Sequence, residues 1–255
     1  MDCELRFFGP TIDQHSGLYG GAIHNPAQAL CEVVAGMHDE NGRVTLPGFY
    51  DSVRPISAEE SAELSRLPMD EEYFLAQTGV QTLWGEPDYP AVERIGARPT
   101  LEINGLLSGW TGEGMKTVLP ATAMAKISTR LVPDQHPKEV SQQLKDYLEA
   151  HVPLTIRWEL EVFSGSPASI SDRDSSEVRA MSKALESVWG TRPLFRRVGG
   201  TIPVVGMIQR ILGVESVLTG FGLPEDNVHS PNERIHLPTW EKGIEALIHF
   251  FYNLV

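Results

Sequence analysis

The chain has 255 residues, 41% of them hydrophobic and 22% charged, and its formal net charge is −13. This composition excludes an intrinsically disordered chain, and the acidic balance argues against a nucleic-acid surface, which depends on clustered lysine and arginine. No window approaches the run of about 18 apolar residues that a membrane-spanning helix needs. The first residues, MDCELRFFGPTI, lack the basic segment and apolar core of a signal peptide, so the expected location is the cytoplasm.

The first part of the chain predicts a small sheet covered by helices. ELRFFGPTI (4–12) alternates like a strand, and Asn25 and Pro26 have the residue types of a helix N-cap and first helical position. The helix that follows has apolar residues at the i, i+3, i+4, i+7 spacing of one buried face, namely Leu30, Val33, Val34 and Met37. Strand-like segments then occupy 100–105 and 121–132.

A second helix and a last strand complete this pattern. The helix has an apolar face made by Val140, Leu144, Tyr147 and Leu148. The strand alternates between apolar and polar side chains over 154–163. The order of elements over residues 4–163 is therefore β-α-β-β-α-β, the ferredoxin-like split βαβ arrangement, with both helices on one face of an antiparallel sheet.

An acidic, proline-rich insertion at about 46–99 interrupts this order. A connection of this length is unusual in a compact domain, and we expect two short surface helices within it. Its paired carboxylates, Glu59–Glu60 and Glu71–Glu72, are interpreted as solvated helix faces.

The residues from 164 to 255 predict an α/β unit of a different kind. SGSPASISDRDSS marks the boundary, and Asp174 with Glu177 is interpreted as a capping box for the next helix. PLFRRV (193–198) is an expected strand, TIPVVGMIQRIL (201–212) an expected helix, and ESVLTGFGL (215–223) an expected strand and loop. The last helix has an apolar stripe made by Trp240, Ile244, Leu247, Ile248, Phe251 and Val255. Two strands are too few to close a core, so this part has the pattern of the end of a larger domain.

Two histidines lie in loops that differ from ordinary turns. His15 is in the glycine-rich segment DQHSGLYGG, which packs little, so the choice is between a simple turn and a histidine with a partner elsewhere. His229 is in LPEDNVHSPNE after an expected strand, where α/β sheets place their ligands, and the alternative is a histidine exposed to water. One histidine is not a metal site, because zinc needs three or four protein ligands.

Two other segments have the chemistry to bind a carboxylate. RVGGTIP (197–203) puts glycines at an expected helix start, where N–H groups and the helix dipole favour an anion, although Thr201 as a plain N-cap explains it equally well. Arg130 shares the polar face of its strand with Lys126 and Ser128, where it either clamps a carboxylate or covers a sheet edge. The chain has no G-x-S-x-G, H-E-x-x-H or Walker motif.

Six motifs occur together in the following order: DQHSGLYGG, NPAQAL, GRVTLPGFYD, TGEGMKTVLPATAMAKISTRLVPDQ, GGTIPVV and GFGLPEDNVHSPNE. With this combination the chain closely resembles the carnosinase-like dipeptidases, which belong to a larger group of di-zinc metallopeptidases and amidohydrolases. The resemblance covers essentially the whole chain but only the second part of the family enzyme. It implies that residues 1–163 are the lid that forms the dimer, and that residues 164–255 are the C-terminal portion of the catalytic α/β domain.

The resemblance also implies a role for each candidate residue. His15 would reach into the active site of the partner subunit and stabilise the tetrahedral oxyanion. His229 would be a zinc ligand, Thr117 and Arg130 would contact the substrate, and Gly200–Thr201 would receive its carboxylate. Two sequence differences occur in this last segment, since Val198 stands where the family usually has glutamate and Thr201 replaces a serine.

The complete active site would hold two zinc ions, with manganese as the alternative, and this chain would supply one ligand. The family's H-x-D motif, bridging aspartate and Glu-Glu pair would precede residue 1, and no H-x-D occurs here. We therefore expect a homodimeric dipeptidase part that needs a missing N-terminal catalytic part, with a dipeptide as substrate and neither nucleic acid nor membrane as partner. The alternatives are a non-catalytic dimerisation module and, less favoured, an unrelated enzyme using His15 and His229 within one subunit.

Overall fold

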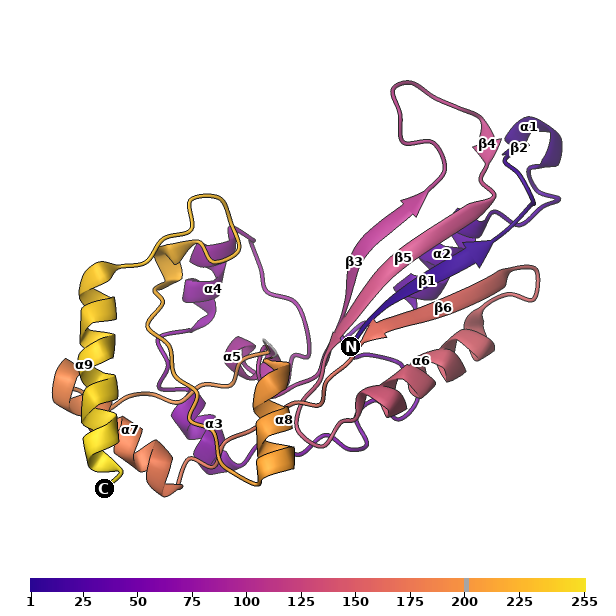
Figure 1. The fold of residues 1–255 in the computed structure, drawn as a ribbon. Coiled ribbons are helices and arrows are strands. Elements are labelled where there is room, and N and C mark those ends of the chain that lie inside the picture. The colour runs from indigo at the N-terminus through magenta and orange to yellow at the C-terminus, as the bar shows by residue number, and fades with distance from the viewer. Residues whose placement is uncertain (200–201) are drawn as a thin grey trace. The chain divides into compact units, whose positions relative to one another are not determined.

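The computed structural model describes residues 1–199 and 202–255 and divides the chain into two compact units. Unit 1 consists of Met1–Ala168 and Arg196–Pro203. Unit 2 consists of Ser169–Phe195 and Val204–Val255. The chain therefore returns to unit 1 for a short segment after it has entered unit 2 (Figure 1).

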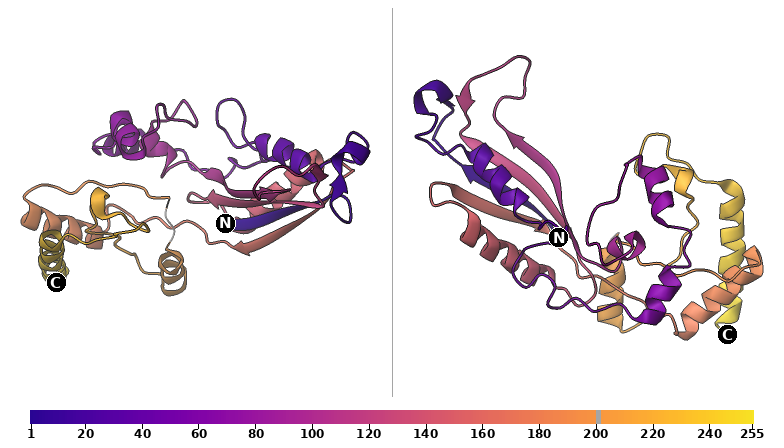
Figure 2. Two further views of the ribbon diagram at one scale, coloured as in Figure 1. Left: turned by 90° about the horizontal axis from the view of Figure 1, so that it is seen from above. Right: turned by 180° about the vertical axis from the view of Figure 1, so that it is seen from behind.

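Unit 1 is built on a four-stranded antiparallel sheet with the strand order β3-β5-β1-β6. Its strands are β1 (Asp2–Phe8), β3 (Thr100–Ser108), β5 (Thr122–Arg130) and β6 (Arg157–Ser164). Helices α2 (Pro26–Ala35) and α6 (Pro137–His151) lie on the same face of the sheet (Figure 2). The expected β-α-β-β-α-β order and ferredoxin-like sheet are confirmed.

The core of unit 1 lies between the sheet and these two helices. Alternate residues of β1, namely Cys3, Leu5 and Phe7, are buried against the helices. All four apolar residues expected on the face of α6 are buried, and the Tyr147 hydroxyl donates to the Val33 carbonyl of α2 at 2.9 Å. Burying each large side chain contributes about 1.5–3 kcal/mol, so this cluster is the main source of stability of unit 1.

The insertion at 46–99 contains the two expected short helices and a third one. They are α3 (Ala58–Leu64), α4 (Glu71–Thr78) and α5 (Ala91–Arg94). Ion pairs to a buried carboxylate hold the end of the insertion, because Glu86 accepts from Arg98 Nε at 2.6 Å and from Arg43 Nη1 at 2.8 Å. The Arg98 guanidinium also stacks between the rings of Tyr50 and Tyr89. The insertion is thus attached to unit 1 by specific contacts.

Short elements extend unit 1 beyond its sheet. They are β2 (Gln14–His15), which pairs antiparallel with β4 (Val118–Leu119), and α1 (Ser16–Tyr19). Along the chain, β2 and α1 follow β1, while β4 precedes β5. Figure 1 shows these elements beyond the end of the sheet at which β5 begins.

Unit 2 is mainly helical. Its elements are α7 (Ser176–Trp189), α8 (Pro203–Leu212) apart from its first residue, a 3-10 turn η1 (Pro224–Asp226) and α9 (Leu237–Asn253). Helices α7 and α9 pack together, and Asn253 Nδ2 donates to the Ala180 carbonyl at 3.2 Å. The cap of α7 is Ser175, whose hydroxyl accepts from the Val178 N–H, so the expected capping box of Asp174 is wrong by one residue.

Both strands expected in the second part of the chain are wrong. Residues 193–198 and 215–223 contain no strand in the part of the chain that the structure describes. A strand needs a hydrogen-bonded neighbour, and the described residues offer neither segment one. The apolar stripe of α9 is partly exposed, with Trp240 49% and Phe251 65% exposed. No helix among the described residues has the length and apolar character required to cross a bilayer.

Candidate functional site

The His15 imidazole is held in place by its own loop. It caps α1, and its Nδ1 atom accepts a hydrogen bond from the Gly17 N–H at 2.8 Å. Because Nδ1 is the acceptor, the proton of the neutral ring resides on Nε2, which is left as the donor. The side chain is exposed, and no residue of α1 is buried. This loop therefore presents a hydrogen-bond donor to the outside of unit 1.

Thr117 lies next to His15 although about a hundred positions separate them in the sequence. The Ser16 N–H donates to the Thr117 carbonyl at 3.1 Å, and His15 pairs with Val118. The Asp13 carboxylate accepts from the Ala121 N–H at 2.9 Å and ties the two segments together again. We call residues 13–20 and 117–121 the tip of unit 1. The tip brings together two of the residues that the sequence predicts for the site.

Arg130 is the last residue of β5 and has an exposed side chain. It lies beside the segment that re-enters unit 1, because a Cβ added to Gly199 would be 3.8 Å from Arg130 Cγ. The same Cβ would be only 2.9 Å from the Ile95 carbonyl oxygen. We call Arg130, Ile95–Gly96 and Arg197–Gly199 the base of unit 1. Gly200 and Thr201, the predicted carboxylate-binding positions, lie outside the described residues, so their role stays a prediction.

The tip and the base are at opposite ends of the sheet. Thr117 precedes β5 and Arg130 ends it, and this strand has nine residues. At about 3.3 Å per residue, the two ends of β5 are about 26 Å apart. A dipeptide is far shorter than this, so His15 and Arg130 of one chain do not reach the same substrate.

His229 lies in unit 2, in the loop between η1 and α9, and is exposed. The loop is closed by Asp226, whose buried carboxylate accepts from the Leu223 N–H at 2.7 Å and whose carbonyl accepts from the Arg234 N–H at 2.9 Å. His229 itself has a φ of 62°, as has Asn232. Such left-handed backbone costs about 1 kcal/mol or more per non-glycine residue and is concentrated at functional sites.

No metal centre is complete within the described residues. They contain no group of three or more histidine, cysteine, aspartate or glutamate side chains placed to hold a metal ion. His229 therefore offers a single imidazole, and zinc needs three or four protein ligands. The described residues of this chain do not by themselves fit a zinc site.

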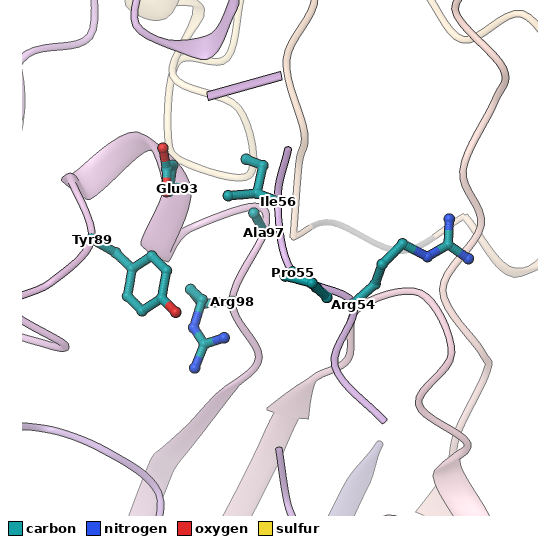
Figure 3. A pocket seen from close by; sticks show the side chains of 7 residues that line it. All are labelled: Arg54, Pro55, Ile56, Tyr89, Glu93, Ala97 and Arg98. Carbon is teal, nitrogen blue, oxygen red and sulfur yellow. The ribbon is translucent and has the colours of Figure 1, made fainter. Parts of the chain in front are cut away.

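A small cavity in unit 1 lies between residues 54–56 and the end of the insertion (Figure 3). Its volume is about 100 Å³, whereas pockets for small molecules usually measure about 300–1,000 Å³. Both arginines that line it are engaged, Arg54 with Asp134 and Arg98 with Glu86. The cavity is therefore too small for a dipeptide and contributes no unpaired cation.

Sequence reasoning missed one ion pair near the base. Glu60 was expected on a solvated face, but it pairs with Arg197, 137 positions away. The Glu60 and Arg197 side chains are 20% and 15% exposed. The sequence around either residue does not predict this ion pair, because helical spacing relates only residues within about one turn of each other.

Comparison with known proteins identifies the family. A family model described as peptidase dimerisation domain, M20 dimer, matches residues 3–155. The Cys-Gly metallodipeptidase DUG1 of Candida albicans is 29% identical over 97% of this chain and 52% of its own length. The Beta-Ala-His dipeptidase of Homo sapiens is 29% identical over 95% of this chain and 48% of its own length.

A solved structure shows the same fold. The M20 family metallo-carboxypeptidase Sso-CP2 from Sulfolobus solfataricus has a TM-score of 0.86 and 30% identity, over 100% of this chain and 58% of that one. The chain thus spans about half the length of the relatives it matches. The match confirms the family that the six sequence motifs indicate.

Proposed function

Because the chain belongs to the M20 peptidase family, through a peptidase dimerisation domain over residues 3–155, we propose that it is the lid and C-terminal part of a metal-dependent dipeptidase. The observation that carries this proposal is the separation of about 26 Å between the tip and the base, estimated from the length of β5. Residues 164–255 are then the C-terminal portion of the catalytic domain.

The separation supports a homodimer in which each active site has contributions from two subunits. A two-fold axis that relates two copies of unit 1 lets the tip of one copy reach the base of the other. Two equivalent sites then form, each with His15 and Thr117 from one subunit and Arg130 from its partner. The fold alone therefore gives a reason for the dimer.

His15 acts in this proposal as the oxyanion donor. The hydrogen bond from Gly17 fixes the ring and leaves Nε2–H as the donor for the negative charge that forms on the attacked carbonyl. Arg130 binds the substrate carboxylate, together with the backbone at Gly200–Thr201 and with Thr117 of the opposite subunit. The peptide bond is thereby placed between a fixed anion site and a fixed donor.

His229 would be one ligand of a metal pair whose other ligands lie on further polypeptide, with zinc as the expected metal and manganese as the alternative. A metal held there would supply Lewis-acid polarisation of the carbonyl and a more acidic attacking water. The chain's share is the strained loop that holds the imidazole. The cytoplasmic location and the exclusion of nucleic acid and membranes as partners stay predictions.

A reconstitution assay tests the proposal. The isolated chain, supplied with Zn²⁺ or Mn²⁺ and a panel of dipeptides, is expected to show no turnover. Co-expression with a segment carrying H-x-D and Glu-Glu motifs should produce turnover that a chelator removes. Chelator-sensitive turnover by the chain alone would overturn the assignment of the missing ligands.

The second candidate is a dimerisation module without catalysis, favoured by the lack of a metal-binding cluster among the described residues. It predicts a dimer in size-exclusion chromatography and no turnover even after reconstitution. A strict monomer would contradict both functions, because each depends on contact between two copies.

A further inference from the structure

We propose that the acidic insertion is a positioning device for the substrate-carboxylate segment, in which Glu60 and Gly96 hold residues 197–199 beside Arg130. This inference rests on the proposed function for the identity of the ligand, a free α-carboxylate. The contacts that hold the segment stand independently of it.

The first contact is a two-point ion pair. Arg197 Nε lies 2.5 Å from Glu60 Oε1, and Arg197 Nη2 lies 2.8 Å from Glu60 Oε2. This parallel arrangement of two charge-assisted hydrogen bonds fixes the direction of the guanidinium as well as its distance. Arg197 is therefore committed to the insertion, whereas the side chain of Arg130 beside it is exposed.

The second contact is a close approach of two backbones. A Cβ on Gly96 would lie 2.6 Å from the Arg197 carbonyl oxygen and 2.7 Å from Arg197 Cβ. A Cβ on Gly199 would lie 2.9 Å from the Ile95 carbonyl oxygen. Neither glycine has a positive φ, so both are needed for space. The segment is thus packed backbone against backbone on the end of α5.

The two helices that make these contacts are themselves joined. Ser61 Oγ of α3 donates to Glu93 Oε1 of α5 at 2.6 Å, and Glu93 is buried. Figure 3 shows Glu93 on the helix that leads into Ala97 and Arg98, the latter anchored by Glu86. Since residues 193–198 have no regular structure, these side-chain contacts supply the order that a hydrogen-bonded strand would otherwise give.

NMR relaxation of the whole chain tests the positioning itself. In Glu60→Gln, the backbone order parameters at 197–199 should fall from the range of a rigid backbone, about 0.85, to below about 0.6, while those of the sheet stay high. Gly96→Ala should act in the same direction. Glu63→Gln is the matched control, because its carboxylate on the same helix pairs with the nearby Arg66. The charge-reversed pair Glu60→Arg with Arg197→Glu should recover the order parameters.

Kinetics of the reconstituted enzyme test the ligand. Glu60→Gln should raise KM about tenfold for a free dipeptide, with kcat changed much less, and should leave KM unchanged for the same dipeptide carrying a C-terminal amide. Unchanged order parameters at 197–199 overturn the positioning, whatever the activity. Lower order parameters with equal effects on both substrates retain the positioning and overturn the carboxylate as its purpose.

Discussion

The two ends of the unit 1 sheet are held by different forces. At the tip, backbone hydrogen bonds and one carboxylate join the segments, and large side chains such as Leu18 remain exposed. At the base, a long-range ion pair and two glycine contacts fix a segment that has no regular structure. Both ends thus join distant parts of the chain, the tip mainly through backbone hydrogen bonds that leave its side chains exposed, and the base through an ion pair between side chains and close glycine contacts.

This difference has a consequence for mutation. Side chains at the tip add little to folding, so their loss should affect function while stability stays the same. Side chains at the base hold the segment Arg197–Gly199 in place. Their loss should first make this segment less ordered and should reduce function as a consequence. The sheet between the two ends serves as a spacer that sets their separation.

The largest effect is expected from a mutation in the sheet between the tip and the base, because loss of its core would unfold both ends together. Phe7 is fully buried under the helices, and Phe7→Ala should lower the free energy of unfolding by about 3–5 kcal/mol through the cavity it leaves. Urea denaturation of the isolated chain measures this change. Phe8→Ala is the control, because Phe8 points to the opposite face under Arg157, and it should cost clearly less.

The next effect separates action across the dimer from action within a subunit. In the reconstituted enzyme, His15→Ala should lower turnover about 10²–10³-fold, as the loss of an oxyanion donor does, and Arg130→Ala should raise KM strongly. A random mixture of the two variants should regain about one quarter of normal activity, because each hybrid of a two-fold dimer has one intact site.

That recovery depends on exchange of subunits, so co-expression with two different affinity tags provides the hybrid directly. If purified hybrids show no recovery, His15 and Arg130 serve the same subunit and the proposed geometry of the site is wrong. Thermal unfolding of each variant should match the parent chain, since both side chains are exposed.

A smaller effect should come from Gly17, which leaves the His15 side chain in place but disturbs its orientation. A Cβ at this position would lie 2.7 Å from His15 Cε1, so Gly17→Ala should rotate the ring and weaken the N–H···Nδ1 bond. We expect turnover to fall about tenfold with unchanged unfolding, in line with the loss of one hydrogen bond. Gly21→Asn is the control: Gly21 has a positive φ that asparagine tolerates, and open space around it.

The parts of this fold that the sequence predicts are those with a local period. The face of α6, with Leu144 and Tyr147, follows from the helical repeat, and the alternation along β1 follows from the strand repeat. The strands expected at 193–198 and 215–223 fail because a strand depends on a neighbour that composition does not reveal. The pair of Glu60 and Arg197 is invisible for the same reason.

The candidate site shows the same division. His15 and Thr117 are conspicuous in their motifs, but their proximity appears only once β2 pairs with β4. Arg130 and Gly199 lie close together because the chain returns to unit 1 at Arg196–Pro203, and the neighbouring sequence does not predict this return. The resemblance to a family supplied roles that spacing alone left open, and the structure adds the distance between the two ends.

The smallest effect is expected on the opening of the sheet when residues of the tip or the base are mutated. The rates at which the two cysteine thiols are modified measure this opening. Cys3 is buried in the sheet and burial raises the pKa of its thiol to about 11, whereas Cys31 on α2 is exposed. Because the thiolate is the reactive form, Cys31 should be modified rapidly at pH 8 and Cys3 only when the sheet opens. His15→Ala and Glu60→Gln should leave the Cys3 rate unchanged, and Phe7→Ala should raise it. A faster Cys3 reaction in His15→Ala would show that the tip stabilises the sheet. The contrast between a tip whose side chains add little to folding and a base whose side chains order a segment would then be wrong.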